Sequence, residues 1–132
     1  MDALIELTDH VAAQLPESTY EAIRLQMRRV AKMFASRNGE LIRELVADAQ
    51  GDPAVADTFL TRFFTHRRAG GAETLVEGVA KGELRADLDI DVALDVLYGP
   101  LWLRLLIGHG PMSPVIVDRV LAVAWPGLVT SP

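Results

Sequence analysis

The chain has 132 residues, of which half are hydrophobic, 23% are charged and none is cysteine. This length predicts a single domain, residues 1–132, whose core needs no disulfide or metal. The lack of cysteine excludes thiolate zinc sites, iron–sulfur clusters and cysteine nucleophiles. A net charge of −5 argues that this chain does not itself bind a nucleic-acid backbone, because such binding depends on Lys and Arg neutralising phosphates.

Apolar residues recur at helical spacing along most of the chain, which predicts an all-α fold of about six helices. The first helix is expected at about 2–15, and it should end before Pro16. Ser18 and Glu21 have the spacing of a capping box, in which each side chain satisfies a free backbone N–H at a helix start. A second helix should therefore begin there, and Asn38-Gly39 is expected to end it.

The middle of the chain predicts two further helices. A short third helix should run from about Leu41 to Gln50-Gly51. Asp52-Pro53 combines a capping side chain with the residue best tolerated in a first helical turn, so a fourth helix should start there. It should continue to about Ala80 with a bend or loosened turn at Gly70-Gly71, because two adjacent glycines weaken a helix by about 1–2 kcal/mol.

The fifth expected helix, about Ile90 to Ile107, is apolar nearly all round and must be covered on several sides. Acidic residues around its first turn, such as Asp89, suit the helix dipole. Pro100 removes a backbone donor inside it and should kink it. The kink can serve to open a pocket or simply to pack the helix at a subunit seam. Ser113-Pro114 then predicts a sixth helix.

The mean hydropathy of +0.21 is high for a small free monomer. The surplus of apolar residues predicts either a surface that meets another subunit or a lined cavity. No apolar run approaches the roughly 20 residues of a membrane span, and the sequence at Met1 does not have the pattern of a signal peptide. We therefore expect a cytoplasmic protein without membrane partners.

The sequence offers no catalytic pattern. The three histidines lack metal-binding spacing, and no nucleophile elbow or phosphate-binding glycine loop is present. We expect no catalytic residue, no metal and no cofactor. The basic residues of the second helix, including Arg24 and Arg28, are interpreted as a solvated face with acidic partners on neighbouring helices rather than as a DNA contact.

A series of short motifs carries a resemblance to a known family. In chain order they are Asp52-Pro53, then Gly82-Glu83-Leu84-Arg85 with Asp87 and Asp89, then Gly99-Pro100 within the hydrophobic helix, then Gly110-Pro111 in the following turn. This order resembles the C-terminal regulatory domain of tetracycline-repressor (TetR) family transcription factors, over residues 16 to 128 or so.

The resemblance implies a homodimer in which the last two long helices of each subunit form a four-helix bundle across a two-fold axis. The residues expected at this interface are Leu97, Leu101, Leu105, Val117, Leu121 and Trp125. It also implies an N-terminal helix-turn-helix domain, which we expect to be absent from this chain. Operator DNA would then be contacted only through that domain.

The resemblance further implies a small-molecule pocket between the helices. The candidate ligand-binding residues are Met27, Phe59, Phe63, His66, Tyr98 and Trp102. They combine apolar bodies with a few polar atoms, as ligand pockets do, although each taken alone is also a plausible core or surface residue. The expected function is the regulatory domain of a repressor that a small, largely apolar effector releases from DNA. An all-helical homodimeric interaction module without a ligand is the alternative.

Overall fold

The computed structural model describes residues 18–129, and the elements in this range are helices. In chain order they are α2 (Thr19–Ala35), α3 (Arg37–Gly51), α4 (Pro53–Thr58), the π-helix η1 (Phe59–Phe64), α5 (Thr65–Ala80), α6 (Ile90–Ile107), α7 (Pro114–Ala124) and the 3₁₀-helix η2 (Trp125–Gly127). The predicted all-α class is confirmed. The first expected helix, at about 2–15, lies outside the described residues.

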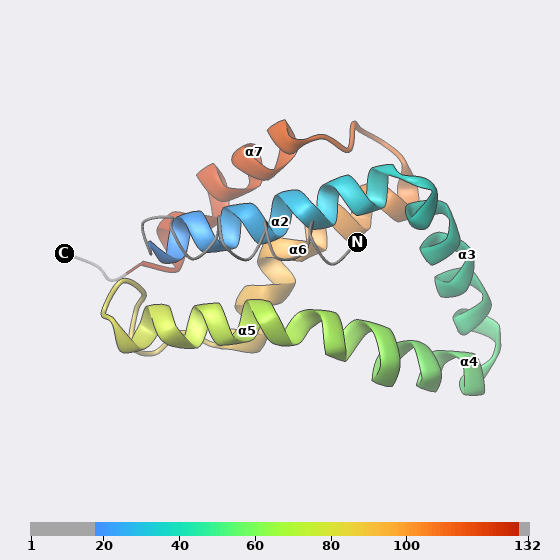
Figure 1. Cartoon of the computed structure of the whole chain (residues 1–132), viewed down its shortest axis with the longest axis horizontal. Coiled ribbons are helices and arrows are strands. Elements are labelled where there is room, and N and C mark those ends of the chain that lie inside the picture. Colours follow the sequence, from blue (N-terminus) through green and yellow to red (C-terminus); the bar gives the residue numbers. More distant parts are fainter. Residues whose placement is uncertain (1–17, 130–132) are drawn as a thin grey trace, which may run out of the picture.

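Helix α2 is the centre of the arrangement. It runs antiparallel to α5 on one side and packs against α7 on the other, while α6 crosses behind it (Figure 1). Helices α3 and α4 connect the far ends of α2 and α5. The core forms where α2, α6 and α7 meet, and its largest fully buried side chains include Ile23, Met27, Leu97 and Leu121. No described helix combines the length and hydrophobicity that crossing a membrane requires.

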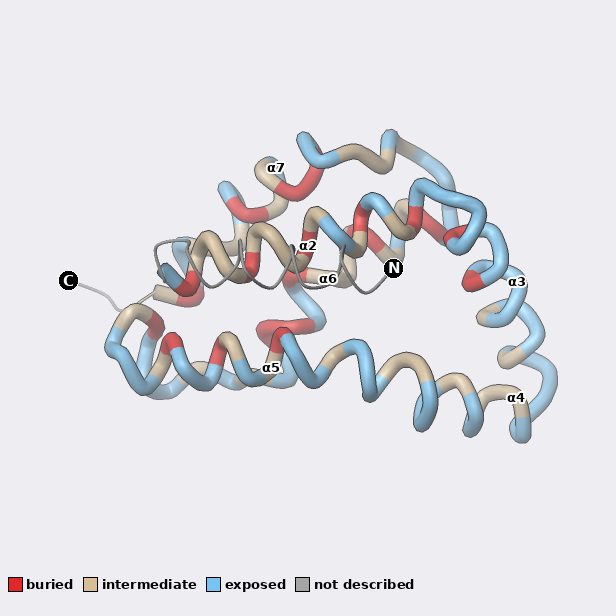
Figure 2. Tube along the Cα trace, viewed as in Figure 1, coloured by how far each residue is buried: buried red, intermediate tan, exposed pale blue. Residues whose placement is uncertain are grey.

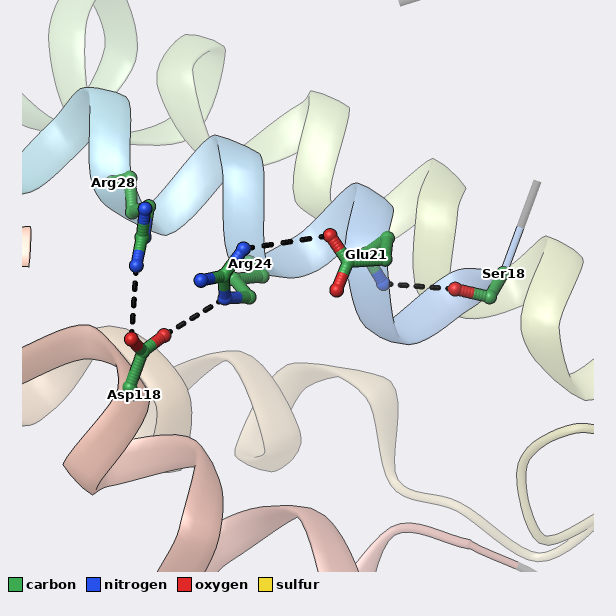
Figure 3. A network of polar contacts seen from close by, with 5 residues as sticks. All are labelled: Ser18, Glu21, Arg24, Arg28 and Asp118. Carbon is green, nitrogen blue, oxygen red and sulfur yellow. Dashed lines mark hydrogen bonds and ion pairs between the residues drawn. The ribbon is translucent and has the colours of Figure 1, made fainter. Parts of the chain in front are cut away.

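Ser18 caps the start of α2 as predicted, but the second acceptor there is Glu83 rather than Glu21. The Ser18 hydroxyl accepts a hydrogen bond from the Glu21 N–H at 3.1 Å (Figure 3). The Glu21 carboxylate does not complete a capping box and instead lies 3.5 Å from Arg24. The Thr19 N–H donates to Glu83 at 2.7 Å, and hydrogen bonds from the side chain and the backbone of Thr19 lower the pKa of the Glu83 carboxyl group. The loop before α6 thus holds the first turn of α2.

Asp118 of α7 connects that helix to α2. Its two carboxylate oxygens accept hydrogen bonds from Arg24 at 2.8 Å and from Arg28 at 2.9 Å (Figure 3). The predicted interpretation of the basic face of α2, with acidic partners on a neighbouring helix, is confirmed for these two arginines.

The predicted end of α2 is wrong. The helix stops at Ala35, because Ser36 turns the chain: its backbone N–H donates to the Met33 carbonyl at 3.1 Å, and its hydroxyl accepts from the Asn38 N–H at 3.2 Å. Asn38-Gly39 lies inside α3 instead. Gly39 is buried against the Phe34 carbonyl, where a Cβ atom would collide. The glycine therefore serves a close approach and not a helix end.

The fourth expected helix is indeed continuous through α4, η1 and α5, and Asp52 caps it by accepting from the Ala54 N–H at 2.9 Å. Its irregularity, however, lies at the π-helix 59–64. Helix α5 continues through both Gly70 and Gly71. Gly71 is buried, and a Cβ atom there would lie 3.0 Å from Leu94 of α6. The lack of a side chain thus lets α5 and α6 approach each other.

Helix α6 has the predicted bounds, with Asp89 accepting from the Val92 N–H at 3.1 Å and Gly108 ending it at φ +71°. The structure corrects which of its faces points inward. Five of the six expected interface residues are 0–6% exposed within a single subunit and belong to its core, and these are Leu97, Leu101, Leu105, Val117 and Leu121. Trp125 is half-buried and packs edge-on against Tyr20 at 5.3 Å. These four leucines and one valine are not available to a second subunit.

Candidate ligand-binding site

A cavity of about 330 Å³ opens between α2, the η1–α5 helix and α6. Its volume lies at the lower end of the range of about 300–1,000 Å³ that is typical of small-molecule sites. The lining residues are Gln26, Arg29, Val30, Met33, Phe34, Phe63, Phe64, Arg67, Arg68, Gly70, Gly71, Tyr98 and Trp102. The cavity is thus walled by apolar and aromatic side chains and carries three arginines, together with the neutral polar groups of Gln26, Tyr98 and Trp102.

Trp102 of α6 is the centre of the aromatic wall. Its ring lies 4.8 Å from that of Phe34, 6.1 Å from that of Phe59 and 6.0 Å from that of Phe64, between ring centroids. Tilted and edge-on aromatic pairs at such distances are favourable beyond their burial of apolar area. The wall therefore joins three helices around one indole ring.

The π-helix places the phenylalanines of this wall. The Thr65 N–H donates to the Leu60 carbonyl, which is an i→i−5 bond and widens the helix by one residue per turn. Phe59 and Phe63 then stack at 5.4 Å, and Phe59 and Phe64 at 6.3 Å, beside Trp102. Such π-helical turns are frequent at functional sites.

Tyr98 brings a hydroxyl group into this apolar surrounding. Burial raises the pKa of Tyr98 to about 12, although the nearby positive charge of Arg29 opposes the shift. The phenol is therefore neutral at physiological pH and can both donate and accept a hydrogen bond. Gln26 adds an amide, whose NH₂ donates to the Thr74 hydroxyl at 2.8 Å.

Three arginines lie at the cavity. The Arg68 guanidinium is 17% exposed and pairs with Asp91 and Asp95 of α6, each at 2.8 Å. It also lies over the Phe64 ring at 5.3 Å, and Arg67 lies over the Phe63 ring at 5.5 Å. The rings thus hold two guanidinium groups at the wall.

The structure places three of the six predicted ligand residues at this cavity: Phe63, Tyr98 and Trp102. Phe59 lies in an adjacent depression of about 410 Å³ near α3 and α4, and reaches Trp102 from there. Met27 is completely buried in the core, and His66 is exposed on α5 away from the cavity lining. We therefore remove Met27 and His66 from the candidate set.

Sequence reasoning missed the contribution of α2 and the arginines. Gln26, Arg29, Val30 and Met33 have the i, i+3, i+4, i+7 spacing of one helical stripe. This stripe lies next to the buried stripe of α2. Its mixture of polar and apolar residues was therefore the sequence feature that could have indicated a cavity wall. Arg67 and Arg68 carried no such signal, because a basic pair usually lies on a solvated surface.

Comparisons with known proteins agree with the fold. The family model described as "Tetracyclin repressor-like, C-terminal domain" matches residues 17–124. The uncharacterised HTH-type transcriptional regulator YdeS of Bacillus subtilis (strain 168) is 34% identical over 129 residues, which cover 97% of this chain and 65% of that protein. The crystal structure of the TetR family transcription regulator SCO0332 superimposes with a TM-score of 0.69 at 29% identity, over 77% of this chain and 57% of that one.

This chain thus spans less than two thirds of the length of either relative. The family model, by contrast, covers most of the chain, and the relatives named above are transcriptional regulators. The helical fold around the α2–α5–α6 cavity agrees with the resemblance that the sequence motifs carry. The chain belongs to the TetR family of transcriptional regulators and contains the C-terminal domain of that family.

Proposed function

We propose that the chain is the effector-binding and dimerisation region of a cytoplasmic repressor, and that a small, largely apolar molecule bound in the cavity releases the repressor from its operator. DNA would be contacted through a helix-turn-helix domain. The observation that carries the proposal is the aromatic cavity of about 330 Å³ around Trp102. An apolar cavity with few polar groups is the usual form of a small-molecule site.

Helix α6 supports this proposal through its three distinct faces. Leu94, Leu97, Leu101 and Leu105 face the core of the subunit. Tyr98 and Trp102 face the cavity, next to the aspartates that hold Arg68. A third, outer stripe is apolar, and it consists of the solvent-exposed Val92, Val96, Leu103 and Leu106 with the half-buried Gly99 between them. One helix therefore adjoins the core, the effector site and a free apolar surface.

The outer stripe supports a homodimer. Its members are separated by alternating intervals of four and three residues, which is the spacing of a seam between paired helices. Its large side chains are 42–53% exposed, and a Cβ atom added at the half-buried Gly99 would meet open space. Helix α7 adds Val115 and Val123, which are 64% and 85% exposed. We propose that these faces of α6 and α7 replace the buried residues as the four-helix interface.

Linkage between the two sites gives a mechanism. Helix α2 lines the cavity with one stripe and is held by α7 through Asp118 with another. An effector that binds one arrangement of α2, α5 and α6 better than another shifts the population toward it. The spacing of two attached DNA-binding domains must match half-sites about one helical turn apart, so a small shift would change operator affinity.

The effector site is tested by the fluorescence of Trp102. The chain has two tryptophans, and Trp125 packs against Tyr20 outside the cavity, so a Trp125→Phe variant reports on Trp102 alone. Small aromatic and aliphatic compounds should change its emission saturably and raise the melting temperature. Tyr98→Ala should weaken these responses at least about tenfold. Unchanged responses in that variant would remove the cavity as the binding site.

The interface is tested with a matched pair of substitutions. Leu103 on the outer stripe of α6 is 53% exposed, and Leu60 in η1 is 51% exposed. Light scattering should give twice the 14.4 kDa subunit mass for the parent chain and for Leu60→Asp. Leu103→Asp should give the subunit mass, because charges buried at the seam would be unpaired. A monomeric parent chain would refute the dimer, and a dimeric Leu103→Asp would refute this interface. A dimer that binds no compound would instead support an interaction module.

A further inference from the structure

The charged side chains that line the cavity are all positive. Its lining contains the guanidinium groups of Arg29, Arg67 and Arg68 and no acidic side chain. The remaining polar side chains of the lining, Gln26, Tyr98 and Trp102, are neutral. A ligand in this cavity therefore meets positive charge that the lining itself does not balance.

Only one of the three positive charges has a carboxylate partner in the part of the chain that the structure describes. Arg68 pairs with two aspartates of α6 and is largely withdrawn from solvent. Arg29 and Arg67 form no ion pair with any carboxylate of residues 18–129, and both remain exposed at the edge of the cavity. Two guanidinium groups are thus available at the entrance to an apolar pocket.

Two of the aromatic rings that line the cavity disfavour a positively charged ligand. Phenylalanine faces attract cations, and a cationic effector would use them. The faces of Phe63 and Phe64 are already occupied by Arg67 and Arg68. A ligand cation would have to displace these groups and would be repelled by them. The Phe63 ring also fixes the Arg67 guanidinium at the entrance, which lowers the entropy lost when it binds an anion.

We propose that the effector is an amphipathic anion, with an aromatic or aliphatic body against Trp102 and a carboxylate held by Arg29 and Arg67. This rests on the proposed effector site and names the class of molecule it takes. Guanidinium groups bind carboxylates through paired, charge-assisted hydrogen bonds. The neutral Tyr98 hydroxyl supplies a further donor to the same end of the ligand.

Three probes of equal body and different charge test the proposal: 4-phenylbutyrate, 4-phenylbutanamide and 4-phenylbutylamine. Their affinities are measured on the whole 132-residue chain in the Trp125→Phe background, by Trp102 fluorescence and by calorimetry. We expect the acid to bind at least about tenfold more tightly than the amide, and the amine to bind no better than the amide. Added salt should weaken binding of the acid alone.

Arginine variants distinguish the contribution of the ligand's charge to affinity from the contribution of its shape. Arg29→Gln and Arg67→Gln should each weaken the acid about five- to thirtyfold and leave the amide within about twofold. Arg67→Lys should restore part of the loss, since the charge returns without the planar fork. Arg43→Gln is the matched control, because Arg43 is exposed on α3 away from the cavity.

The outcomes distinguish the two proposals. If the amide binds as tightly as the acid, or if neither arginine variant discriminates between them, the anionic effector is refuted while the cavity remains a binding site. If no probe binds whatever its charge, and an octanoate and octanamide pair also fails, the effector site itself is refuted together with this inference. Equal losses in Arg43→Gln would show a general charge effect and would also refute the specific roles of Arg29 and Arg67.

Discussion

The two ends of the helical arrangement are packed very differently. Figure 2 shows buried segments where α2, α6 and α7 meet. Leucines of this region such as Leu101 and Leu121 are fully buried. Helix α4 and the π-helix η1 contribute no buried residue within the described part of the chain. Figure 2 shows this region as exposed and half-buried tube only. One region holds most of the buried side chains, and the other contributes Phe63 and Phe64 to the wall of the cavity.

This difference means that the residues that stabilise the fold lie largely apart from those of the loosely packed η1. Regions with few buried apolar contacts open and rearrange at low free energy, and ligand-binding elements are usually found there. Under the proposed function, η1 would adjust around an effector while the α2–α6–α7 core keeps its packing. Helix α6 lies in both regions, because Leu101 faces the core and Trp102 faces the cavity. It is therefore the element that joins the cavity wall to the core.

The largest expected effect is in the core. Leu101→Ala should lower the free energy of unfolding by about 2–5 kcal/mol, because it removes a fully buried side chain and leaves a cavity that its neighbours cannot fill. Urea unfolding at fixed protein concentration measures the change, since association also contributes to stability. A loss below about 1 kcal/mol would contradict the assignment of Leu101 to the subunit core and would reopen its role at the interface.

Two glycines on α5 sharpen the same contrast. Gly78 is buried, and a Cβ atom there would lie 2.7 Å from Thr19 and 2.8 Å from Leu84. Gly78→Ala should therefore destabilise the chain by about 1–3 kcal/mol through overpacking. At Gly70, by the cavity, a Cβ atom would meet open space, so Gly70→Ala should stabilise α5 by about 0.5–1 kcal/mol. Thermal unfolding of both variants measures the difference, and a shift of the same sign would contradict it.

A smaller and pH-dependent effect is expected at Asp118, where α7 meets α2. The hydrogen bond from Arg24 lowers the pKa of this carboxyl group, with Arg28 adding to the shift and burial opposing it. A carboxyl group with a lowered pKa in the folded state stabilises it above the unfolded value of about 3.9, and this contribution is lost as pH falls through the folded value.

Asp118→Asn should therefore destabilise the chain at neutral pH by less than Gly78→Ala does, because the pair is partly exposed. The parent chain should lose stability more steeply than the variant as pH falls below about 4. Urea unfolding from neutral pH down to about pH 3 compares the two slopes. Other carboxyl groups with lowered pKa values, such as Glu83, act equally in both proteins, so parallel slopes would contradict the role of Asp118.

The sequence correctly predicted the features that residues close together in the chain determine. Capping residues such as Asp52 and Asp89 act on their own helix turn, so the starts of α4 and α6 were predicted correctly. The π-helix was not predicted, since it depends on phenylalanine rings packing against Trp102 from a distant helix. The two glycines at 70–71 suggested an irregularity in the right helix but at the wrong turn.

The faces of α6 show a second limit to prediction from the sequence. A helix that is apolar all round gives no preferred side, so the sequence could not tell the core leucines from the outer stripe. The interface assignment therefore fell on residues such as Leu97 that the structure buries in one subunit. At the cavity, aromatic residues such as Trp102 were predictable from their chemistry. Arg67 was not, because its position over the Phe63 ring depends on the π-helix.

The smallest expected effect makes the contrast between the two regions most direct. Leu60→Ala removes the same atoms as Leu101→Ala, but from a side chain of η1 that is 51% exposed. Little apolar area returns to water and no cavity forms, so the free energy of unfolding should change by no more than about 0.5 kcal/mol. Urea unfolding of the two leucine variants side by side measures this ratio. A loss above about 1.5 kcal/mol at Leu60 would mean that a partner or second subunit covers η1 in solution, and the cavity wall would then be part of a packed interface rather than a yielding surface.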